Sequence, residues 1–202
     1  MDFSKVREAL EARGFSVAVC PTKEAASEYL NEKIDGMTVG FGGSMTLGEM
    51  GLYDSLSRHN TMHDHWHVPK GCSPDEARVA AMSTEVYLTS ANGLAETGEL
   101  INIDGTGNRV AATLYGHEEV WFVVGVNKIA PDYAAALWRA RNIASPKNAQ
   151  RIGTKTPCAA KGDKCYDCHS PERICRGVVT LLKKPTGIKR AYVVLVEEEL
   201  GY

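Results

Sequence analysis

The sequence of 202 residues predicts an α/β protein with a largely parallel sheet and an inserted antiparallel hairpin. Three observations indicate this class. Strand-like apolar runs alternate with amphipathic helical segments along the first two-thirds of the chain. The run 120–124 is apolar throughout, as is typical of a strand buried on both faces. Finally, 44% hydrophobic and 24% charged residues are ordinary values for a globular protein, so we expect a single domain over residues 1–202.

The first half of the chain is expected to alternate helices with strands. Apolar residues on one face predict a helix over residues 3–13, which Gly14 ends. Another helix is expected to begin at Ser73, because Pro74 suits the first turn and Glu76 can close a capping box. The remaining elements predicted here are strands over 15–20 and 36–40 and helices over 23–32 and 46–58.

The second half is expected to add strands over residues 86–89, 99–103, 120–124 and 191–196. The turn-forming run 104–108 predicts a hairpin that joins 99–103 to a strand over 110–115. A long helix is predicted over 130–144, with Pro131 near its start and Pro146 just beyond its end. Residues 153–178 interrupt this pattern, and we interpret them as a cysteine-rich insertion or tail.

Charge and hydropathy exclude several classes of partner. Lys plus Arg number 23 and Asp plus Glu 25, so the net charge of −2 creates no field that attracts nucleic acid or an anionic membrane. The longest strongly apolar run, 120–126, is far shorter than the roughly 20 residues of a membrane span. The N-terminal residues mix charges and lack the apolar stretch of a secretory signal. We therefore expect a cytoplasmic protein.

A glycine-rich turn over residues 39–46 follows a predicted strand and precedes a predicted helix. Ligands of open α/β sheets bind beyond the carboxyl ends of strands, where glycines let the backbone approach an anion. Met45 stands where a dinucleotide fingerprint needs glycine, and no P-loop lysine follows, so neither an NAD site nor a P-loop nucleotide site is predicted. The candidate ligand-binding residues are Gly42, Gly43, Ser44 and Thr46; the alternative is a tight turn with a serine cap.

A second polar loop, residues 89–98, also follows a predicted strand. It offers Asn92 and Thr97 as ligand-binding residues and Glu96 as a catalytic nucleophile or general base. The alternative is a solvated loop whose carboxylate contacts nothing. We expect Ser44 and Glu96 to meet at one edge of the sheet, where they would form a cavity for a small anionic metabolite.

Four of the six cysteines lie in one short segment: Cys158, Cys165, Cys168 and Cys175. Four thiolates suffice for zinc or for an iron–sulfur cluster, and we name these residues as candidate metal ligands. Their spacing is neither that of a ferredoxin nor that of a zinc ribbon with two C-x2-C pairs. Because charged residues surround the thiols, burial does not explain them, and a redox-active or structural disulfide and plain reduced thiols stay open as alternatives.

His63, His65 and His67 alternate, so on a strand they would share one face. Neutral imidazoles are good ligands for zinc, iron or nickel. A strand alone, however, spaces such side chains about 7 Å apart, too far to share one small ion. A polar or interface face is therefore the favoured interpretation, and a metal site is the alternative.

Several segments together are similar to one known family: 39–52 (VGFGGSMTLGEMGL), 91–99 (ANGLAETGE), 125–129 (GVNKI), 139–141 (RAR), 146–149 (PKNA) and 200–202 (LGY). On these residues the chain resembles LUD-domain proteins of the LutC/YkgG lactate-utilisation type, over essentially its whole length. The resemblance implies a three-layer fold of the NagB/RpiA/CoA transferase-like superfamily, with the loop 42–46 at the ligand pocket. It also implies a role in oxidising lactate to pyruvate beside iron–sulfur and flavin-type partner subunits, and it implies no known catalytic residue.

Two functional hypotheses follow. The first is an accessory subunit in the oxidation of lactate or a related 2-hydroxy acid, with an anion-binding pocket at the strand ends. The alternative is a non-catalytic module that senses a ligand or redox state and docks on an iron–sulfur partner through its cysteine segment. The sequence leaves open whether the chain is itself an enzyme and whether it forms a homo-oligomer.

Overall fold

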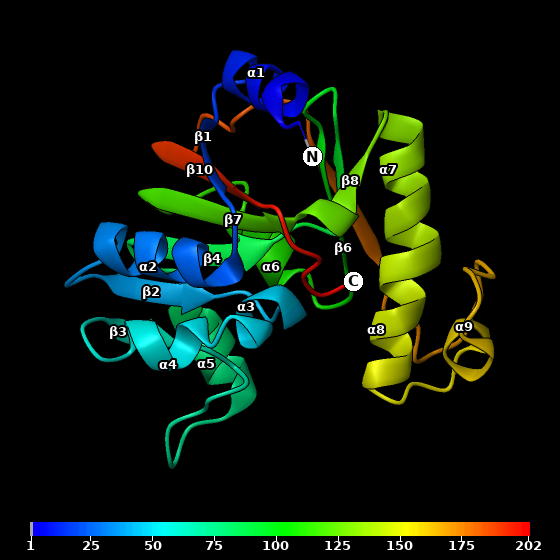
Figure 1. Ribbon diagram of the computed structural model, residues 1–202. Helices are drawn as coiled ribbons and strands as arrows, with labels where there is room; N and C mark the ends of the chain where they lie inside the picture. The colour runs from blue at the N-terminus through cyan, green and yellow to red at the C-terminus, as the bar shows by residue number, and fades with distance from the viewer. Residues whose placement is uncertain (1) are drawn as a thin grey trace.

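A computed structural model describes residues 2–202 and confirms an α/β fold around a parallel sheet (Figure 1). Six strands form this central sheet in the order β1-β10-β7-β4-β2-β3, and every pairing is parallel. The strands are β1 (Ser16–Cys20), β2 (Thr38–Phe41), β3 (Thr61–His63), β4 (Val86–Ser90), β7 (Glu119–Gly125) and β10 (Arg190–Val196).

The central strands supply side chains to two separate cores. Every residue of β4 and β7 is buried. Along β7, Val120, Phe122 and Val124 enter one core, whereas Trp121 and Val123 enter the other. This alternation explains why an uninterrupted apolar run is stable as a strand, since both of its faces are covered.

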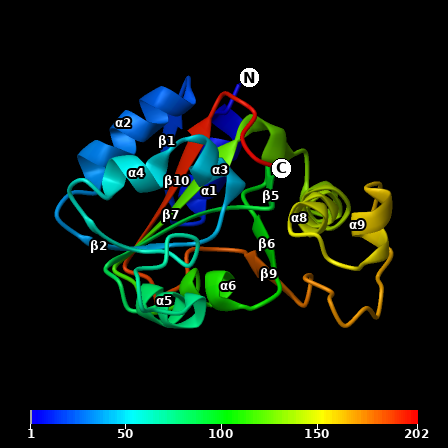
Figure 2. The ribbon, with the colours of Figure 1, turned by 90° about the horizontal axis from the view of Figure 1, so that it is seen from below.

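Different layers cover the two faces of the central sheet (Figures 1 and 2). Helices α2 (Lys23–Lys33), α3 (Met45–Glu49) and α4 (Leu52–Leu56) pack on one face. The opposite core is closed by α1 (Ser4–Ala12), α5 (Pro74–Ala81), α6 (Asn108–Ala112) and a second sheet of order β8-β5-β6-β9. Its strands are β5 (Gly93–Ala95), β6 (Leu100–Asp104), β8 (Ile129–Ala130) and β9 (Gly177–Leu181).

A long helical segment packs on the outer side of the second sheet (Figure 1). It runs through α7 (Tyr133–Arg139), a π-helical turn η2 (Ala140–Ala144) and α8 (Ser145–Arg151) without a break. The predicted stop before Pro146 is therefore wrong. Proline cannot donate the backbone hydrogen bond of an α-helix, but the wider π turn ahead of it relaxes that requirement, and Ser145 Oγ donates to the Ala140 carbonyl at 2.9 Å.

Two further predictions about elements need correction. The helix expected over 46–58 is divided into α3 and α4 at Gly51, whose φ of 62° is left-handed. The hairpin expected with a strand over 110–115 does not form, because residues 110–112 belong to α6 and residues 113–114 form the turn that follows it. The Asp104 carboxylate accepts from the amides of Thr106 and Gly107, and this turn starts the helix instead. The antiparallel partners of β6 are β5 and β9.

The cysteine-rich segment is not a distinct structural unit. It contains the short helix α9 (Pro157–Lys161) and an irregular stretch over residues 162–176, and it ends in β9 of the second sheet. Within residues 2–202, no helix is long and apolar enough to cross a membrane.

Candidate ligand-binding site

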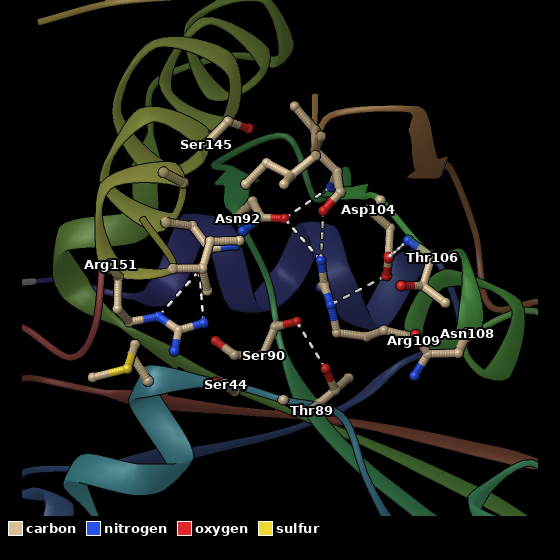
Figure 3. A pocket seen from close by; sticks show the side chains of 18 of the residues that line it. Ser44, Thr89, Ser90, Asn92, Asp104, Thr106, Asn108, Arg109, Ser145 and Arg151 are labelled. Atoms are coloured by element: carbon tan, nitrogen blue, oxygen red, sulfur yellow. Dashed lines mark hydrogen bonds and ion pairs between the residues drawn. The ribbon is translucent and has the colours of Figure 1, made fainter. Parts of the chain in front are cut away.

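A polar cavity of about 420 Å³ lies where the carboxyl ends of β2 and β4 meet α8 (Figure 3). Segments far apart in the chain converge there, because parallel strands present their carboxyl ends at one edge of the sheet. The polar lining residues include Ser44, His65, Thr89, Ser90, Asn92, Asp104, Asn108, Arg109, Lys128, Ser145, Asn148, Arg151 and Tyr202. A concave site of this size suits a small-molecule ligand.

The glycine-rich turn supplies one wall of this cavity, and Gly43 and Ser44 line it directly. A Cβ on Gly43 would stand only 3.0 Å from the ring atoms of His65 and Trp66, so the glycine admits these side chains. Ser44 caps α3, since its hydroxyl accepts from the Leu47 amide at 3.5 Å. Gly42 packs beneath the surface, where a Cβ would meet Thr89 Oγ1 at 2.8 Å. Thus the turn is both a capped turn and a cavity wall.

Lys128 is the most unusual residue of the site, because its ammonium group is buried with only 3% of the residue exposed. Its Nζ donates to Thr46 Oγ1 at 2.6 Å and to Ser90 Oγ at 3.0 Å. Those hydroxyls donate onward to the carbonyls of Leu200 and Val123, so they present lone pairs to the ammonium. Thr46 therefore acts by holding Lys128; it is fully buried and does not line the cavity.

An ammonium group carries three N–H bonds, and within residues 2–202 Lys128 uses two of them. Its side chain lines the cavity, so the remaining N–H is available to a ligand. Desolvation by burial, together with the smaller effect of the nearby cations Arg139 and Arg109, lowers the pKa of Lys128 to about 7. Lys128 can therefore change its charge near neutral pH when an anion enters.

Arg109 forms a rigid part of the wall (Figure 3). Its guanidinium donates to Asn92 Oδ1 at 3.1 Å and to the Ile103 carbonyl at 2.7 Å, and its Nε lies 3.6 Å from Asp104 Oδ2. It also donates to Asn102 Oδ1. Burial lowers the pKa of Arg109, while the Asp104 carboxylate opposes that shift. Asn92, a predicted ligand-binding residue, lines the cavity, and its side-chain oxygen Oδ1 is engaged in holding Arg109.

The far wall belongs to α8 and to the end of the chain. Arg151 Nε donates to Tyr202 Oη at 2.9 Å, and Nη2 donates to Asn148 Oδ1 at 2.9 Å. The guanidinium also lies over the Trp66 ring, 5.0 Å from its centroid. With Arg78, Arg109 and Lys128, four cationic side chains line the cavity against one carboxylate, Asp104. The site therefore favours an anionic ligand.

The predicted meeting of Glu96 with the glycine-rich turn does not occur. Glu96 Oε2 pairs with Lys5 Nζ of α1 at 2.8 Å, and the Thr97 carbonyl accepts from Arg13 at 2.8 Å. Neither residue lines the cavity. The reason is that the stretch 89–98 is not one loop: it enters β5 at Gly93, and this strand carries the following residues toward α1.

Several residues of the cavity were missed at the sequence level, namely Arg78, Asp104, Arg109, Lys128, Arg151 and Tyr202. One signal was available for Lys128, because it lies just past the end of the apolar strand β7, where ligand sites are expected. Arg109 was hidden by the prediction of a strand over 110–115. Arg151 and Tyr202 reach the cavity only because of where α8 and residue 202 lie in the fold, and no local sequence pattern predicts those positions.

The histidines do not share a strand face. Only His63 belongs to β3, and the chain then turns around the buried carboxylate of Asp64. This carboxylate lies 2.6 Å from His67 Nδ1 and 3.6 Å from His65 Nδ1. His67 also stacks on Tyr53 at 3.8 Å. Their contacts with Asp64 and Tyr53 hold His65 and His67 in this turn. Among residues 2–202, no three His, Cys, Asp or Glu side chains are grouped closely enough to hold an ion.

Comparison with known proteins identifies the family. The LUD domain matches residues 3–196. Among solved structures, the crystal structure of a DUF162 family protein from Deinococcus radiodurans at 1.70 Å resolution is similar, with a TM-score of 0.51 and 11% sequence identity. The alignment covers 97% of this chain and 99% of that chain, and at this identity it supports the fold. No curated protein matches significantly. The chain belongs to the LUD-domain family.

Proposed function

We propose that the protein is a subunit acting in the oxidation of lactate or a related 2-hydroxy acid, and that its cavity binds the acid. The LUD-domain family is associated with lactate utilisation. The observation that carries the proposal is the buried ammonium of Lys128, which lines a cavity rich in cations and hydroxyls. A buried cation with a free donor is a strong anchor for a carboxylate, because the low local dielectric strengthens their attraction.

A 2-hydroxy acid carries a carboxylate and a hydroxyl on adjacent carbons. Its recognition therefore requires a cation and a polar side chain within a few ångströms of each other. Lys128, Ser44 and Ser90 supply these groups at neighbouring strand ends. The cavity of about 420 Å³ is larger than a three-carbon acid needs, so longer 2-hydroxy acids belong to the same proposal.

Oxidation of a 2-hydroxy acid to a 2-oxo acid releases two electrons and two protons, which an acceptor must take. The chain carries no dinucleotide-binding fingerprint that would hold a nicotinamide or flavin dinucleotide as that acceptor. We assign the acceptor to a partner subunit of the flavin or iron–sulfur class. The role of this chain is then to bind and orient the acid.

The proposal is tested by measuring the affinity of the protein for a series of 2-hydroxy acids of increasing length by calorimetry. Lys128→Met should weaken binding at least about tenfold, since it removes a charge-assisted hydrogen bond of about 1.5–3 kcal/mol. Lys5→Met is the matched control, because Lys5 is an exposed lysine paired with Glu96 away from the cavity. Equal affinity in Lys128→Met and wild type, or no binding of any 2-hydroxy acid, would contradict the proposal.

A further inference from the structure

Residues 162–176 connect α9 to β9 without forming any helix or strand. None of these residues is fully buried, so the segment has no apolar core of its own. A stretch of this length without regular structure is uncommon in an ordered domain, because fixing its backbone costs about 1–2 kcal/mol per residue. Something else must therefore hold it in place.

Four thiols of this region converge on one small cavity. Cys158 comes from α9, whereas Cys165, Cys168 and Cys175 come from the irregular segment. All four line the same cavity, although the first and last are far apart in sequence. Each is partly exposed and none forms a disulfide. Four reduced cysteines around one small cavity supply the donor set of a thiophilic metal centre.

The turn between Cys165 and Cys168 also suits a metal centre. The Asp167 amide donates to Cys165 Sγ at 3.4 Å, so the backbone of the turn already contacts this sulfur. Asp167 has a φ of 45°, and it is the one non-glycine residue with a positive φ in the range 2–202. This left-handed residue turns the chain sharply between the two cysteines, so that both thiols reach the same cavity.

The charges around the cavity match those of a thiolate centre. Four thiolates around a divalent ion leave a net charge of −2, and Arg141 and Arg173 both line the cavity. Arg173 donates to the carbonyls of Cys168 and Cys175 at 2.8 and 2.9 Å, and it joins Asp167 at 2.9 Å. One arginine thus ties together the parts of the segment that carry three of the four thiols.

We propose that Cys158, Cys165, Cys168 and Cys175 bind one metal centre, a zinc ion or an iron–sulfur cluster, and that this centre fixes one wall of the ligand cavity. Within residues 2–202, no three cysteine, histidine or carboxylate side chains are close enough together to bind one ion. Metal binding therefore requires the four thiols to move closer together across the cavity that they line. Metal binding and ordering of the segment are then one event.

The metal centre and the ligand cavity share a wall. Ser145 of α8 and Ile174 of the irregular segment line both cavities. The Ile174 carbonyl packs against Gly105, where a Cβ would stand 2.7 Å away, and the Arg176 amide donates to the Asp104 carbonyl at 2.9 Å. Ordering the segment therefore positions the backbone beside Asp104, which is part of the ligand site.

The first test is the metal content of protein purified without oxygen. We expect about one zinc ion per chain, or iron with an equal amount of sulfide. Reduced protein isolated without metal should take up Zn²⁺ alone, or ferric iron with sulfide in the presence of a thiol reductant. The Cys168→Ser variant should contain at least about tenfold less metal than wild type. Cys72 is an exposed cysteine outside the set, so the Cys72→Ser variant should contain as much metal as wild type.

Hydrogen exchange of the wild-type chain provides a test that needs no variant. Removal of the metal with a chelator should speed amide exchange in residues 162–176, including the Arg176 amide that donates to Asp104. The exchange rates of the α1 amides should stay unchanged. Reduced protein that binds neither Zn²⁺ nor iron with sulfide would overturn the proposal, as would disulfides joining these cysteines in anaerobically prepared protein. These outcomes do not depend on whether the cavity binds a 2-hydroxy acid.

Discussion

Lys128 combines burial with a charge, which is costly unless the charge has partners. Two hydroxyls accept from its ammonium, and nearby cations oppose its protonation. The result is a pKa of about 7, far below the ordinary value of 10.5 for lysine. Such a group is uncharged for part of the time at neutral pH and gains a proton when a negative charge comes close.

This shift predicts how stability depends on pH. Folded Lys128 loses its proton near pH 7, whereas the same residue in the unfolded chain keeps it up to about pH 10.5. Between these values the unfolded state binds more protons, so the free energy of unfolding rises with pH by up to about 1.4 kcal/mol per unit from this group.

Lys128→Met should lose that contribution. Denaturant unfolding of both proteins between pH 6.5 and 9.5 should therefore give a difference in free energy that changes steadily with pH. Parallel curves for wild type and variant would show that Lys128 keeps an ordinary pKa in the folded protein.

At the scale of elements, β2 and α5 approach closely where β2 runs toward the glycine-rich turn. A Cβ on Gly40 would stand 2.5 Å from the Ala81 carbonyl and 2.7 Å from Thr84 Oγ1. Glycine at this position is thus required by packing, and it does not line the cavity. The close approach fixes where β2 ends, and hence where Ser44 enters the cavity.

Gly40→Ala should therefore destabilise the protein by about 1–3 kcal/mol, the usual cost of overpacking. Gly48→Ala is the matched control, because a Cβ there meets nothing within 4 Å in helix α3. It should leave stability unchanged or raise it by up to about 1 kcal/mol. Thermal or denaturant unfolding of the two variants compares them directly, and equal effects would refute the packing argument.

At the scale of the whole molecule, two sheets and the long helix of α7, η2 and α8 enclose a site that no single segment contains (Figures 1 and 3). Ser44, Asn92 and Lys128 follow three strands that are distant in the chain, and the final residue Tyr202 holds Arg151. The fold thus assembles a cation-rich cavity from residues that have little local pattern.

The central sheet could be predicted from the sequence because an uninterrupted apolar run, such as residues 120–124, indicates a strand that is buried on both faces. The capping box at Ser73 was predicted for the same kind of local reason and is confirmed. Glu96 was misplaced, since β5 is only Gly93–Ala95 and is too short to be recognised. The meeting of Lys128 with Thr46 and Ser90 depends on strand order, which local composition does not encode.

The uptake of protons on ligand binding tests the account most directly. Calorimetry of a 2-hydroxy acid at pH 8 in two buffers of different ionisation enthalpy measures the protons bound together with the ligand. Because Lys128 has a pKa of about 7 and must be charged to hold a carboxylate, wild type should take up nearly one proton per ligand at pH 8 and almost none at pH 6. Binding at pH 8 without any proton uptake would contradict the anchoring role of Lys128.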